Sequence, residues 1–261
     1  MNTVIVVPHF IATEELKTLA TNALKSMKGS VYLVSVDDGS PMDTTFLREY
    51  SDKVITLEKN SGFAKACNAG FDWALDQDFE FVGCANNDIE VFEGWLDALL
   101  EPFDKWNNTG ITGITHDVNH KVGETFKGTK ITEGGLIGDR MQNGGLWMST
   151  KKVLLEAAPD KKVFDEIFEI GGEEDVDLFL RIRDKLMRPI IMSNKSVIWH
   201  KEGATRWNND IEPGFAKKNR ELEQKNYDKF AEKWGFDIRK TGLTFYEDVL
   251  EDGPNQCYNG G

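Results

Sequence analysis

Acidic, amide and imidazole side chains gather at five places in this sequence, and their types suit the binding of a nucleotide, a metal ion or a reacting hydroxyl group. Four are short clusters and the fifth is a single histidine: Asp-Asp-Gly-Ser at 37–40, Asn-Ser-Gly-Phe at 60–63, Asn-Asn-Asp at 86–88, Glu-Glu-Asp-Val-Asp at 173–177, and His200. Each also has an ordinary structural explanation, because Asp, Asn, Gly and Ser are common in turns and acids stabilise helix N-termini.

The first two clusters have the chemistry of a nucleotide site. A carboxylate at Asp37 or Asp38 can accept hydrogen bonds from a base N–H or from ribose hydroxyls. Asn60 opens a predicted helix, where it either caps the helix or lies beside N–H groups that, with Lys65, face a diphosphate. Asn68 lies about one turn beyond Lys65 and either joins that site or packs as a polar core residue.

The other clusters suit a metal ion and a general base. Mg²⁺ and Mn²⁺ take few protein carboxylates and complete their shell with phosphate and water, so Asp88 alone is enough to anchor one. The carboxylates at 173–177 repel one another, which raises some of their pKa values and suits a general base. The alternative is a helix N-terminus stabilised by acids. His200 follows a predicted strand and is either structural or a ligand.

The elements around these clusters alternate between strand and helix over the first third of the chain. Short apolar runs at 4–7, 31–36, 54–57 and 79–84 predict strands, and apolar stripes at 16–27 and 63–75 predict helices between them. Such alternation is typical of a parallel sheet covered by helices. The polar residues at 8–10, 37–40 and 86–88 all follow strands, at the edge where open α/β sheets bind ligands.

The rest of the chain is less regular. Residues 115–142 show no clear hydrophobic period, and long segments of this kind often carry function. We expect them, together with residues 144–147, to build the side of the site that binds a second substrate, here called the acceptor side. Further on, strands are predicted near 144–149, 189–192 and 196–199, and helices at 150–158, 175–187 and 213–234. Interleaved charges on the last helix favour packing with one solvated face, and binding to anionic lipid is the alternative.

Composition excludes several classes of protein. With 31 basic and 44 acidic residues the net charge is −13, which disfavours binding to a nucleic acid backbone. The three cysteines, Cys67, Cys84 and Cys257, form no CxxC pair, so we expect neither a zinc site nor a disulfide framework. No signal peptide or transmembrane run is visible, and we expect a cytoplasmic protein.

The order of the motifs resembles the family 2 glycosyltransferases of the GT-A fold, in particular their rhamnosyltransferase-like branch. The resemblance spans about residues 3 to 235 and is carried by Val-Val-Pro at 6–8, Val-Asp-Asp-Gly-Ser at 36–40, residues 60–70, Asn-Asn-Asp-Ile-Glu-Val at 86–91, Gly-Trp-Leu at 94–96, Glu-Asp-Val-Asp-Leu-Phe-Leu-Arg at 174–181, residues 200–205 and Lys-Trp-Gly at 233–235. It implies an α/β GT-A fold with a mixed, mostly parallel sheet and helices on both faces.

The resemblance also implies an inverting sugar transfer from a nucleotide-diphosphate sugar, UDP- or dTDP-linked, with Mn²⁺ or Mg²⁺. By position it implies Asp175 as the catalytic base and Asp88 with His200 at the metal. We assign the remaining residues to two groups. The donor group is Pro8, His9, Asp37, Asp38, Asn60, Lys65, Asn68 and Asn87, and the acceptor group is Gly145, Trp147 and Glu174.

One departure from the family pattern concerns the metal. The first acid of the family's DxD motif is Asn86 here, which implies weaker metal binding or a metal held mainly through the nucleotide. Trp147 offers a flat face for a sugar ring or a base, and a core tryptophan is the alternative.

We expect a single domain over 1–261, with a nucleotide-sugar half at 1–90, an acceptor and catalytic half at 91–205, and a C-terminal helix and tail at 206–261. The acceptor is a glycan, a lipid-linked glycan or, less favoured, a modified nucleic-acid base. A nucleotidyltransferase is a second hypothesis, although it predicts a Gly-rich loop where this chain has Pro-His-Phe-Ile at 8–11. A catalytically silent binding module is a third, although Asp88 and Asp175 are both present.

Overall fold

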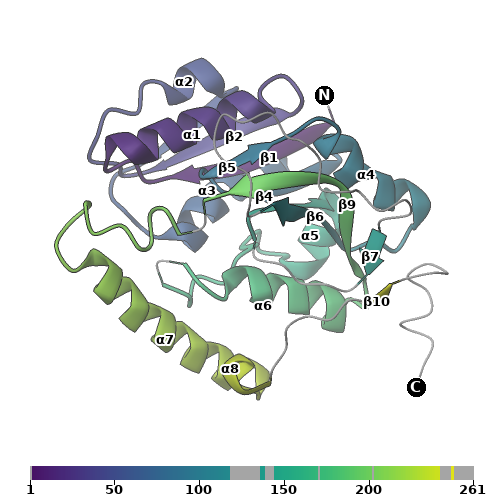
Figure 1. Ribbon diagram of the computed structural model, residues 1–261. Helices are drawn as coiled ribbons and strands as arrows, with labels where there is room; N and C mark the ends of the chain where they lie inside the picture. Colours follow the sequence, from purple (N-terminus) through teal and green to yellow (C-terminus); the bar gives the residue numbers. More distant parts are fainter. Residues whose placement is uncertain are drawn as a thin grey trace.

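The computed structural model describes residues 2–117, 136–138, 144–169, 171–201, 203–241 and 248–249 (Figure 1). Strands and helices alternate from the N-terminus as predicted. In chain order the elements are β1 (Thr3–His9), α1 (Glu14–Met27), β2 (Tyr32–Asp38), α2 (Leu47–Tyr50), β3 (Lys53–Leu57), α3 (Phe63–Asp76), β4 (Phe81–Ala85), β5 (Ile89–Val91), α4 (Trp95–Lys105), β6 (Ile111–Asp117), β7 (Leu136–Gly138), β8 (Leu146–Thr150), α5 (Lys151–Ala157), α6 (Glu174–Leu180), the π-helix η1 (Arg181–Lys185), β9 (Ile190–His200), α7 (Phe215–Trp234), α8 (Ile238–Thr241) and β10 (Asp248–Val249).

The described strands form one mixed sheet in the order β10-β7-β9-β6-β8-β4-β1-β2-β3, with β5 paired to β9 outside this path. The strands β3, β2, β1 and β4 run parallel, and β6 runs parallel to β9. The β4–β8, β8–β6, β9–β7, β7–β10 and β5–β9 pairs are antiparallel. The predicted α/β class with a mixed sheet is therefore confirmed.

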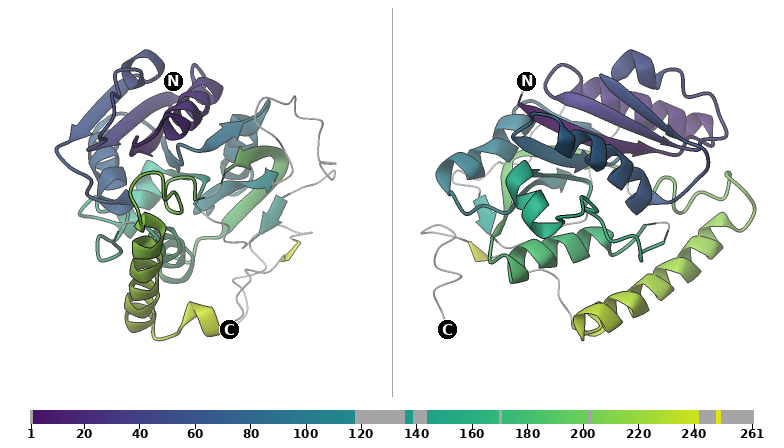
Figure 2. Two further views of the ribbon diagram at one scale, coloured as in Figure 1. Left: turned by 60° about the vertical axis from the view of Figure 1, so that its left-hand side comes forward. Right: turned by 180° about the vertical axis from the view of Figure 1, so that it is seen from behind.

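Helices cover both faces of this sheet, which explains why its central strands are apolar throughout. Along β1, successive side chains point to opposite faces. Ile5 and Val7 join a core with α1 and α4, whereas Val4 and Val6 join a core with α3, α6 and α7. Figure 1 shows α1 and α2 on one side of the sheet and α6 and α7 on the other, and Figure 2 shows the same layers from behind.

The helix α1 shows how the sequence specifies its element. The Thr13 side chain accepts a hydrogen bond from the Leu16 N–H at 3.2 Å and so caps the N-terminus. Its buried residues are those of the predicted apolar stripe: Leu16, Leu19, Ala20, Ala23, Leu24 and Met27. The 3.6-residue period is thus a sufficient signal for this helix and for the face it buries.

Two later elements differ from the sequence-based prediction. The predicted strands at 189–192 and 196–199 are one continuous strand, β9, whose pairing with β6 skips from Ser193 to Val197. This bulge accommodates the polar residues that we interpreted as a break. The predicted helix at 175–187 ends its α-helical part at Leu180 and continues as the π-helix η1.

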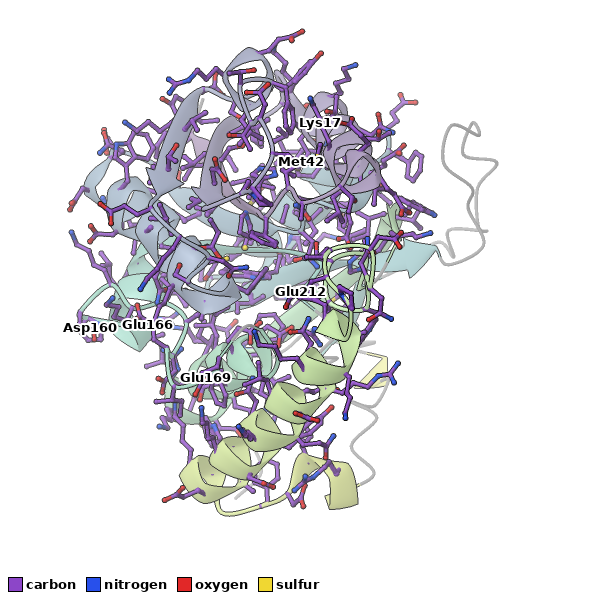
Figure 3. All side chains as sticks on the ribbon, turned by 90° about the vertical axis from the view of Figure 1, so that its left-hand side faces the viewer. Lys17, Met42, Asp160, Glu166, Glu169 and Glu212 are labelled. Atoms are coloured by element: carbon purple, nitrogen blue, oxygen red, sulfur yellow. The ribbon has the colours of Figure 1, made fainter. Side chains whose placement is uncertain are left out.

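The C-terminal helix α7 packs on the main core through the fully buried ring of Phe230, which contacts Trp234 and Phe236. Its buried face also includes two polar residues, Asn219 and Asn226. Figure 3 shows Glu212 in the loop that leads into this helix and Glu169 on the segment beside it. Of the helices in the described ranges, none combines the length and the apolar character needed to cross a bilayer.

Candidate functional site

A cavity of about 590 Å³ opens where the carboxyl ends of β1, β2 and β4 meet the start of α6, the loop after β9 and the start of α7. It brings together residues from all five polar sites of the sequence. Its walls are formed by Pro8, His9, Phe10, Asp38, Asn60, Gly62, Phe63, Ala66, Asn86, Asn87, Asp88, Gly144, Gly171, Glu174, Asp175, His200, Gly203, Thr205, Arg206, Trp207, Phe215 and Asn219. We call this cavity the cleft.

Strand pairing explains why Asp88 and His200 meet, although 112 residues separate them in the sequence. The short strand β5 begins directly after Asp88, and its first residue, Ile89, pairs with His200 at the end of β9. The Asp88 Oδ1 atom lies 3.1 Å from His200 Nε2, and both side chains are buried. The Asp88 backbone carbonyl accepts a hydrogen bond from the Lys201 N–H at 3.0 Å. A sheet edge therefore fixes the carboxylate and the imidazole side by side.

The residues beside this pair fit a hard divalent cation that is also held by phosphate. The Oδ1 atom of Asn86 is buried without a hydrogen-bond partner among the described residues, and its Nδ2 atom lies 3.2 Å from His200 Nε2. One carboxylate, one amide oxygen and one imidazole are a partial ligand set, which phosphate oxygens and water would complete. Within the described ranges, no group of three or more His, Cys, Asp or Glu residues could hold a metal without such help.

Asp38 holds the start of α3 and also lines the cleft. Its carboxylate accepts hydrogen bonds from the Ser61 N–H at 2.8 Å, the Ser61 hydroxyl at 2.6 Å and the Gly62 N–H at 2.9 Å. Gly39, with φ of +64°, permits this approach, because a Cβ atom there would lie 2.3 Å from the Lys59 backbone. Burial raises the pKa of Asp38, although these hydrogen bonds oppose the shift.

Asp37 is a turn residue in this structure. Its carboxylate accepts hydrogen bonds from the Ser40 N–H at 3.0 Å and the Thr44 hydroxyl at 2.7 Å. It is buried and does not line the cleft. Of the two acids at the end of β2, only Asp38 therefore lines the cleft.

His9 lines the cleft with a neutral ring. Its Nε2 atom lies 3.0 Å from Ser35 Oγ, and its Nδ1 atom is buried without a hydrogen-bond partner in the described part of the chain. Burial lowers the pKa of His9 to about 3, and the charge of Asp37 only partly opposes this shift. The ring therefore offers a nucleotide a neutral hydrogen-bonding group.

The lowered pKa of His9 predicts a pH-dependent stability. Below about pH 6.5 His9 becomes protonated in the unfolded chain, whereas in the folded protein it stays neutral down to about pH 3. The free energy of unfolding therefore falls as the pH is lowered through this range. Relative to the His9→Gln variant, we expect the unfolding free energy of the wild type to fall by up to about 1.4 kcal/mol per pH unit. Urea unfolding of both proteins between pH 7 and pH 4 measures this difference, and parallel curves would contradict the assignment.

Three of the acids at the start of α6 lie together beside the cleft, where Glu173 and Glu174 are buried and Asp175 is half-buried. Asp175 Oδ2 accepts a hydrogen bond from the Gly144 N–H at 2.7 Å, and Oδ1 accepts one from the Val176 N–H at 2.8 Å. Burial raises the pKa of Asp175. Burial, with the charge of Asp175 as the next cause, raises the pKa of Glu174 to about 7 and that of Glu173 to about 8. Glu174 and Asp175 line the cleft.

The fourth acid, Asp177, serves the fold. It is fully buried and points away from the cleft, where it binds Arg181 Nε at 2.9 Å, Lys233 Nζ at 2.6 Å and Trp234 Nε1 at 3.0 Å. This separation from Asp175 follows from two helical steps of about 100° each. Of the four acids, Glu174 and Asp175 thus line the cleft, whereas Asp177 anchors α7.

Residues 4–168 match the family model described as Glycosyl transferase family 2, which covers more than half of the chain. The chain belongs to glycosyl transferase family 2. No curated protein matches the sequence at a significant level. The match ends before Asp175 and His200, so it does not cover these two residues.

Solved structures with the same fold support the GT-A architecture of this family 2 member. The chain is similar to the crystal structure of GalNAc-T7 with UDP, GalNAc and Mn²⁺, with a TM-score of 0.63 and 18% identity over 90% of this chain and 48% of that chain. It is also similar to S. aureus TarS 1–349, with a TM-score of 0.53 and 18% identity over 93% of this chain and 76% of that chain. The TarS 1–349 complex with UDP matches with a TM-score of 0.53 and 17% identity over 96% of this chain and 77% of that chain.

Besides Asp37, two more of the predicted donor residues, Lys65 and Asn68, lie outside the cleft of this family 2 protein. Asn68 is buried on the far side of α3, where its amide donates to the Phe164 carbonyl at 2.8 Å and accepts from the Phe164 N–H at 3.0 Å. Lys65 lies with Asn68 in a separate surface hollow beside Glu166. The cleft instead receives Phe63 and Ala66. Lys65 and Asn68 therefore lie on a face of α3 other than the one that lines the cleft, and Asn68 is the polar core residue of the alternative interpretation.

The predicted acceptor residues are also only partly at the cleft. Glu174 lines it, whereas Gly145 does not and uses its carbonyl to accept the Asn86 N–H at 2.8 Å. Its neighbour Gly144 takes the cleft position, and a Cβ atom there would lie 2.8 Å from Asp175 Oδ2. Most of the segment 115–142, also assigned to the acceptor side, lies outside the described residues.

Trp147 is a core residue, contrary to its predicted role as an acceptor platform. The side chain is 2% exposed, and its ring packs at centroid distances of 5.8–6.2 Å against Phe71, Phe164 and Phe179. Its ring projects from β8 into the core that the sheet forms with α3 and α6, the helices that carry Phe71 and Phe179.

The burial of Trp147 predicts a large loss of stability on truncation. We expect Trp147→Ala to lower the unfolding free energy by about 3–5 kcal/mol, because the change leaves a cavity among aromatic rings. Urea unfolding measures the loss, and Trp147→Phe should lose less because part of the contact remains. A variant of normal stability with a weakened acceptor affinity would support the acceptor role instead.

Sequence reasoning missed the aromatic and C-terminal residues of the cleft: Phe10, Phe63, Arg206, Trp207, Phe215 and Asn219. Trp207 is 37% exposed, and the guanidinium groups of Arg206 and Arg220 lie 5.6 Å and 5.4 Å from its ring. Adjacent Arg and Trp soon after His200 were the available signal. Their role depends on the path of the chain from β9 to α7, which no local pattern specifies.

Proposed function

We propose that this family 2 protein is an inverting, divalent-metal-dependent glycosyltransferase that moves a sugar from a nucleotide-diphosphate sugar to a hydroxyl acceptor. The observation that carries the proposal is that one cleft contains both the Asp88–His200 pair and the half-buried Asp175 carboxylate. The first suits a metal-bound diphosphate and the second suits an acceptor hydroxyl. The motif order further favours the rhamnosyltransferase-like branch of the family.

In this proposal the nucleoside occupies the end of the cleft formed by the loops after β1 and β2. Pro8, His9, Asp38 and Asn60 provide polar and backbone contacts there, and Phe10 adds an aromatic surface. UDP or dTDP is the proposed carrier, and the UDP in the TarS and GalNAc-T7 structures supports the first of these.

Asp88, His200 and the amide groups of Asn86 and Asn87 would hold Mn²⁺ or Mg²⁺ with the diphosphate. When bound, such a cation neutralises the negative charge that develops on the departing nucleotide, an effect worth several kcal/mol. The Mn²⁺ in the GalNAc-T7 structure supports this choice of metal. The buried Oδ1 atom of Asn86 is a ready ligand, because it has no other partner among the described residues.

Asp175 acts as the general base in this proposal. Two backbone N–H groups fix its carboxylate, which retains lone pairs for the proton of an acceptor hydroxyl. The acceptor oxygen bonds to the anomeric carbon as the bond from that carbon to the phosphate oxygen breaks on the opposite face. One displacement inverts the anomeric centre. The acceptor class is a glycan, a lipid-linked glycan or, less favoured, a modified nucleic-acid base.

We also propose a reducing compartment such as the cytoplasm. Cys67 and Cys84 are buried free thiols with their sulfur atoms 3.7 Å apart. Buried cysteines of this kind are common in proteins of reducing compartments, where thiols act as small apolar core groups.

A thermal-shift panel tests the proposal. UDP-, dTDP- and GDP-sugars are added with Mn²⁺ or with a chelator, and nucleoside monophosphates serve as controls without a diphosphate. We expect one nucleotide class to raise Tm by about 5–10 °C at a hundredfold excess over its Kd, and the chelator to remove most of this rise. The absence of any shift with any nucleotide sugar in Mn²⁺ would contradict the proposal.

A further inference from the structure

We propose that Asn219 of α7 is a specificity-determining residue, whose side-chain oxygen accepts a hydrogen bond from a sugar hydroxyl in the cleft. The inference rests on the proposed function, because it assigns a role within the same site. It also makes the C-terminal helix a part of the binding site in addition to a packing element.

The first observation is an unsatisfied polar atom in a buried side chain. Asn219 is 4% exposed and lines the cleft. Its Nδ2 atom donates a hydrogen bond to the Arg206 carbonyl at 2.8 Å, whereas its Oδ1 atom is buried without a partner in the part of the chain that the structure describes. A buried amide oxygen without a partner is costly, and proteins retain such atoms where a ligand supplies the missing donor.

The second observation is that the bond to Arg206 fixes the orientation of the amide. Because Nδ2 is held by the backbone carbonyl, the atom left without a partner on this cleft-lining side chain, among the described residues, is Oδ1. A carbonyl oxygen only accepts hydrogen bonds, so its partner must be a donor. Phosphate oxygens of a nucleotide lack such a donor at neutral pH, whereas sugars carry several hydroxyl donors. The ribose hydroxyls and the base N–H are donors too, but the proposed function places the nucleoside at the loops after β1 and β2, beside Asp38 and Asn60.

The surroundings of Asn219 match sugar recognition, in which a few placed polar groups act beside flat apolar surfaces. Phe215 lies one helical turn earlier on α7 and also lines the cleft, as does the partly exposed indole of Trp207. The hydroxyl could belong to the transferred sugar of the donor or to a sugar of the acceptor. Both present the same chemistry to Asn219.

Asn226 provides a matched comparison on the same helix. It lies two turns further along and is fully buried, but its Oδ1 atom accepts the Glu169 N–H at 3.1 Å. Its Nδ2 atom donates to the carbonyls of Glu169 at 3.0 Å and Gly172 at 3.2 Å. Of the two buried asparagines, Asn219 is therefore the one that lines the cleft and whose side-chain oxygen has no hydrogen-bond partner among the described residues.

The test compares Asn219→Ala with Asn226→Ala. Calorimetry gives the Kd of each protein for UDP and for the UDP-sugar that the wild type binds most tightly, with Mn²⁺ present. Saturation-transfer NMR then measures the binding of methyl glycosides in the presence of UDP and Mn²⁺. If Asn219→Ala does not fold, Asn219→Ser replaces it, because serine is too short to place an acceptor at the same point.

We expect Asn219→Ala to weaken binding of the sugar-bearing ligand by about 3–10-fold while UDP affinity is unchanged. A loss for the UDP-sugar identifies the transferred sugar as the source of the hydroxyl, and a loss for the methyl glycoside identifies the acceptor. Asn226→Ala should lower Tm without changing the binding of the UDP-sugar or of the methyl glycoside. Unchanged binding of both sugar ligands by the Asn219 variant would overturn the inference, whereas a wild type that binds no nucleotide sugar would contradict the proposed function itself.

Discussion

Asp175→Asn is expected to lower kcat by about 10²–10⁴ while the donor affinity changes little. An acceptor hydroxyl is a weak nucleophile at neutral pH and needs a base to take its proton as the new bond forms. Asparagine has nearly the shape of aspartate but cannot take that proton. Steady-state kinetics with saturating nucleotide sugar measure the loss, and calorimetry with UDP measures the donor affinity.

The pH dependence of the wild type should reflect the same group. Burial raises the pKa of Asp175, so the carboxylate becomes protonated, and inactive as a base, at a higher pH than an ordinary aspartate. Activity should therefore fall on the acidic side, and the midpoint of this fall should lie above the usual aspartate range. The acidic limb should disappear from the residual activity of Asp175→Asn.

Asp177→Asn is the matched control, because it makes the same chemical change two residues away. Asp177 is bound to Arg181 and Lys233 and does not line the cleft, so its substitution should lower stability and leave kcat nearly normal below the unfolding temperature. Near-normal turnover by Asp175→Asn, or a product with retained anomeric configuration, would show that the proposed mechanism is wrong.

Asp88→Asn is expected to remove most activity and the enhancement of nucleotide binding by metal. The variant keeps the size of the side chain and can still contact His200, but it removes the carboxylate nearest the proposed cation. Loss of a metal contribution of several kcal/mol corresponds to at least about 10²-fold in rate. Calorimetry with UDP, with and without Mn²⁺, measures the binding, and release of nucleoside diphosphate measures the rate.

Glu90→Gln is the control for this substitution. Glu90 lies two residues beyond Asp88, on the adjoining strand β5. It does not line the cleft, and its carboxylate accepts a hydrogen bond from the Asn22 amide. Its variant should bind Mn²⁺ and UDP as the wild type does. Full activity of the wild type in excess chelator, or unchanged metal enhancement in Asp88→Asn, would remove the metal from the account.

Local patterns were enough to predict most of the fold. The apolar period of α1 identified all of its buried residues, and the alternation of strands and helices predicted the parallel part of the sheet. The same alternation placed Asp38 and Asp88 at one sheet edge, because the carboxyl ends of neighbouring parallel strands lie together. The pairing of β5 with β9, which brings His200 to Asp88, is a long-range contact that no such pattern contains.

The failures at the site concern which way a side chain faces. Asn68 and Lys65 lie on the right helix, but the face that meets the cleft depends on how α3 rotates against the sheet. Trp147 and a surface-exposed Trp look alike in a sequence, and only the packing of α3 and α6 over this face of β8 decides between them. Asn219 was hidden for the opposite reason, since a polar residue on a charged helix is expected to face solvent.

The most direct test of the proposed mechanism is an assay of the purified protein with a nucleotide sugar, Mn²⁺ and a hydroxyl acceptor. The assay measures the release of nucleoside diphosphate, and NMR then determines the anomeric configuration of the product. We expect the release to need both the metal and the acceptor, and the product to have an inverted anomeric centre. The rate of release should fall by at least about 10²-fold in both Asp88→Asn and Asp175→Asn. Undiminished release in either variant, or a retained configuration, would contradict the proposed mechanism.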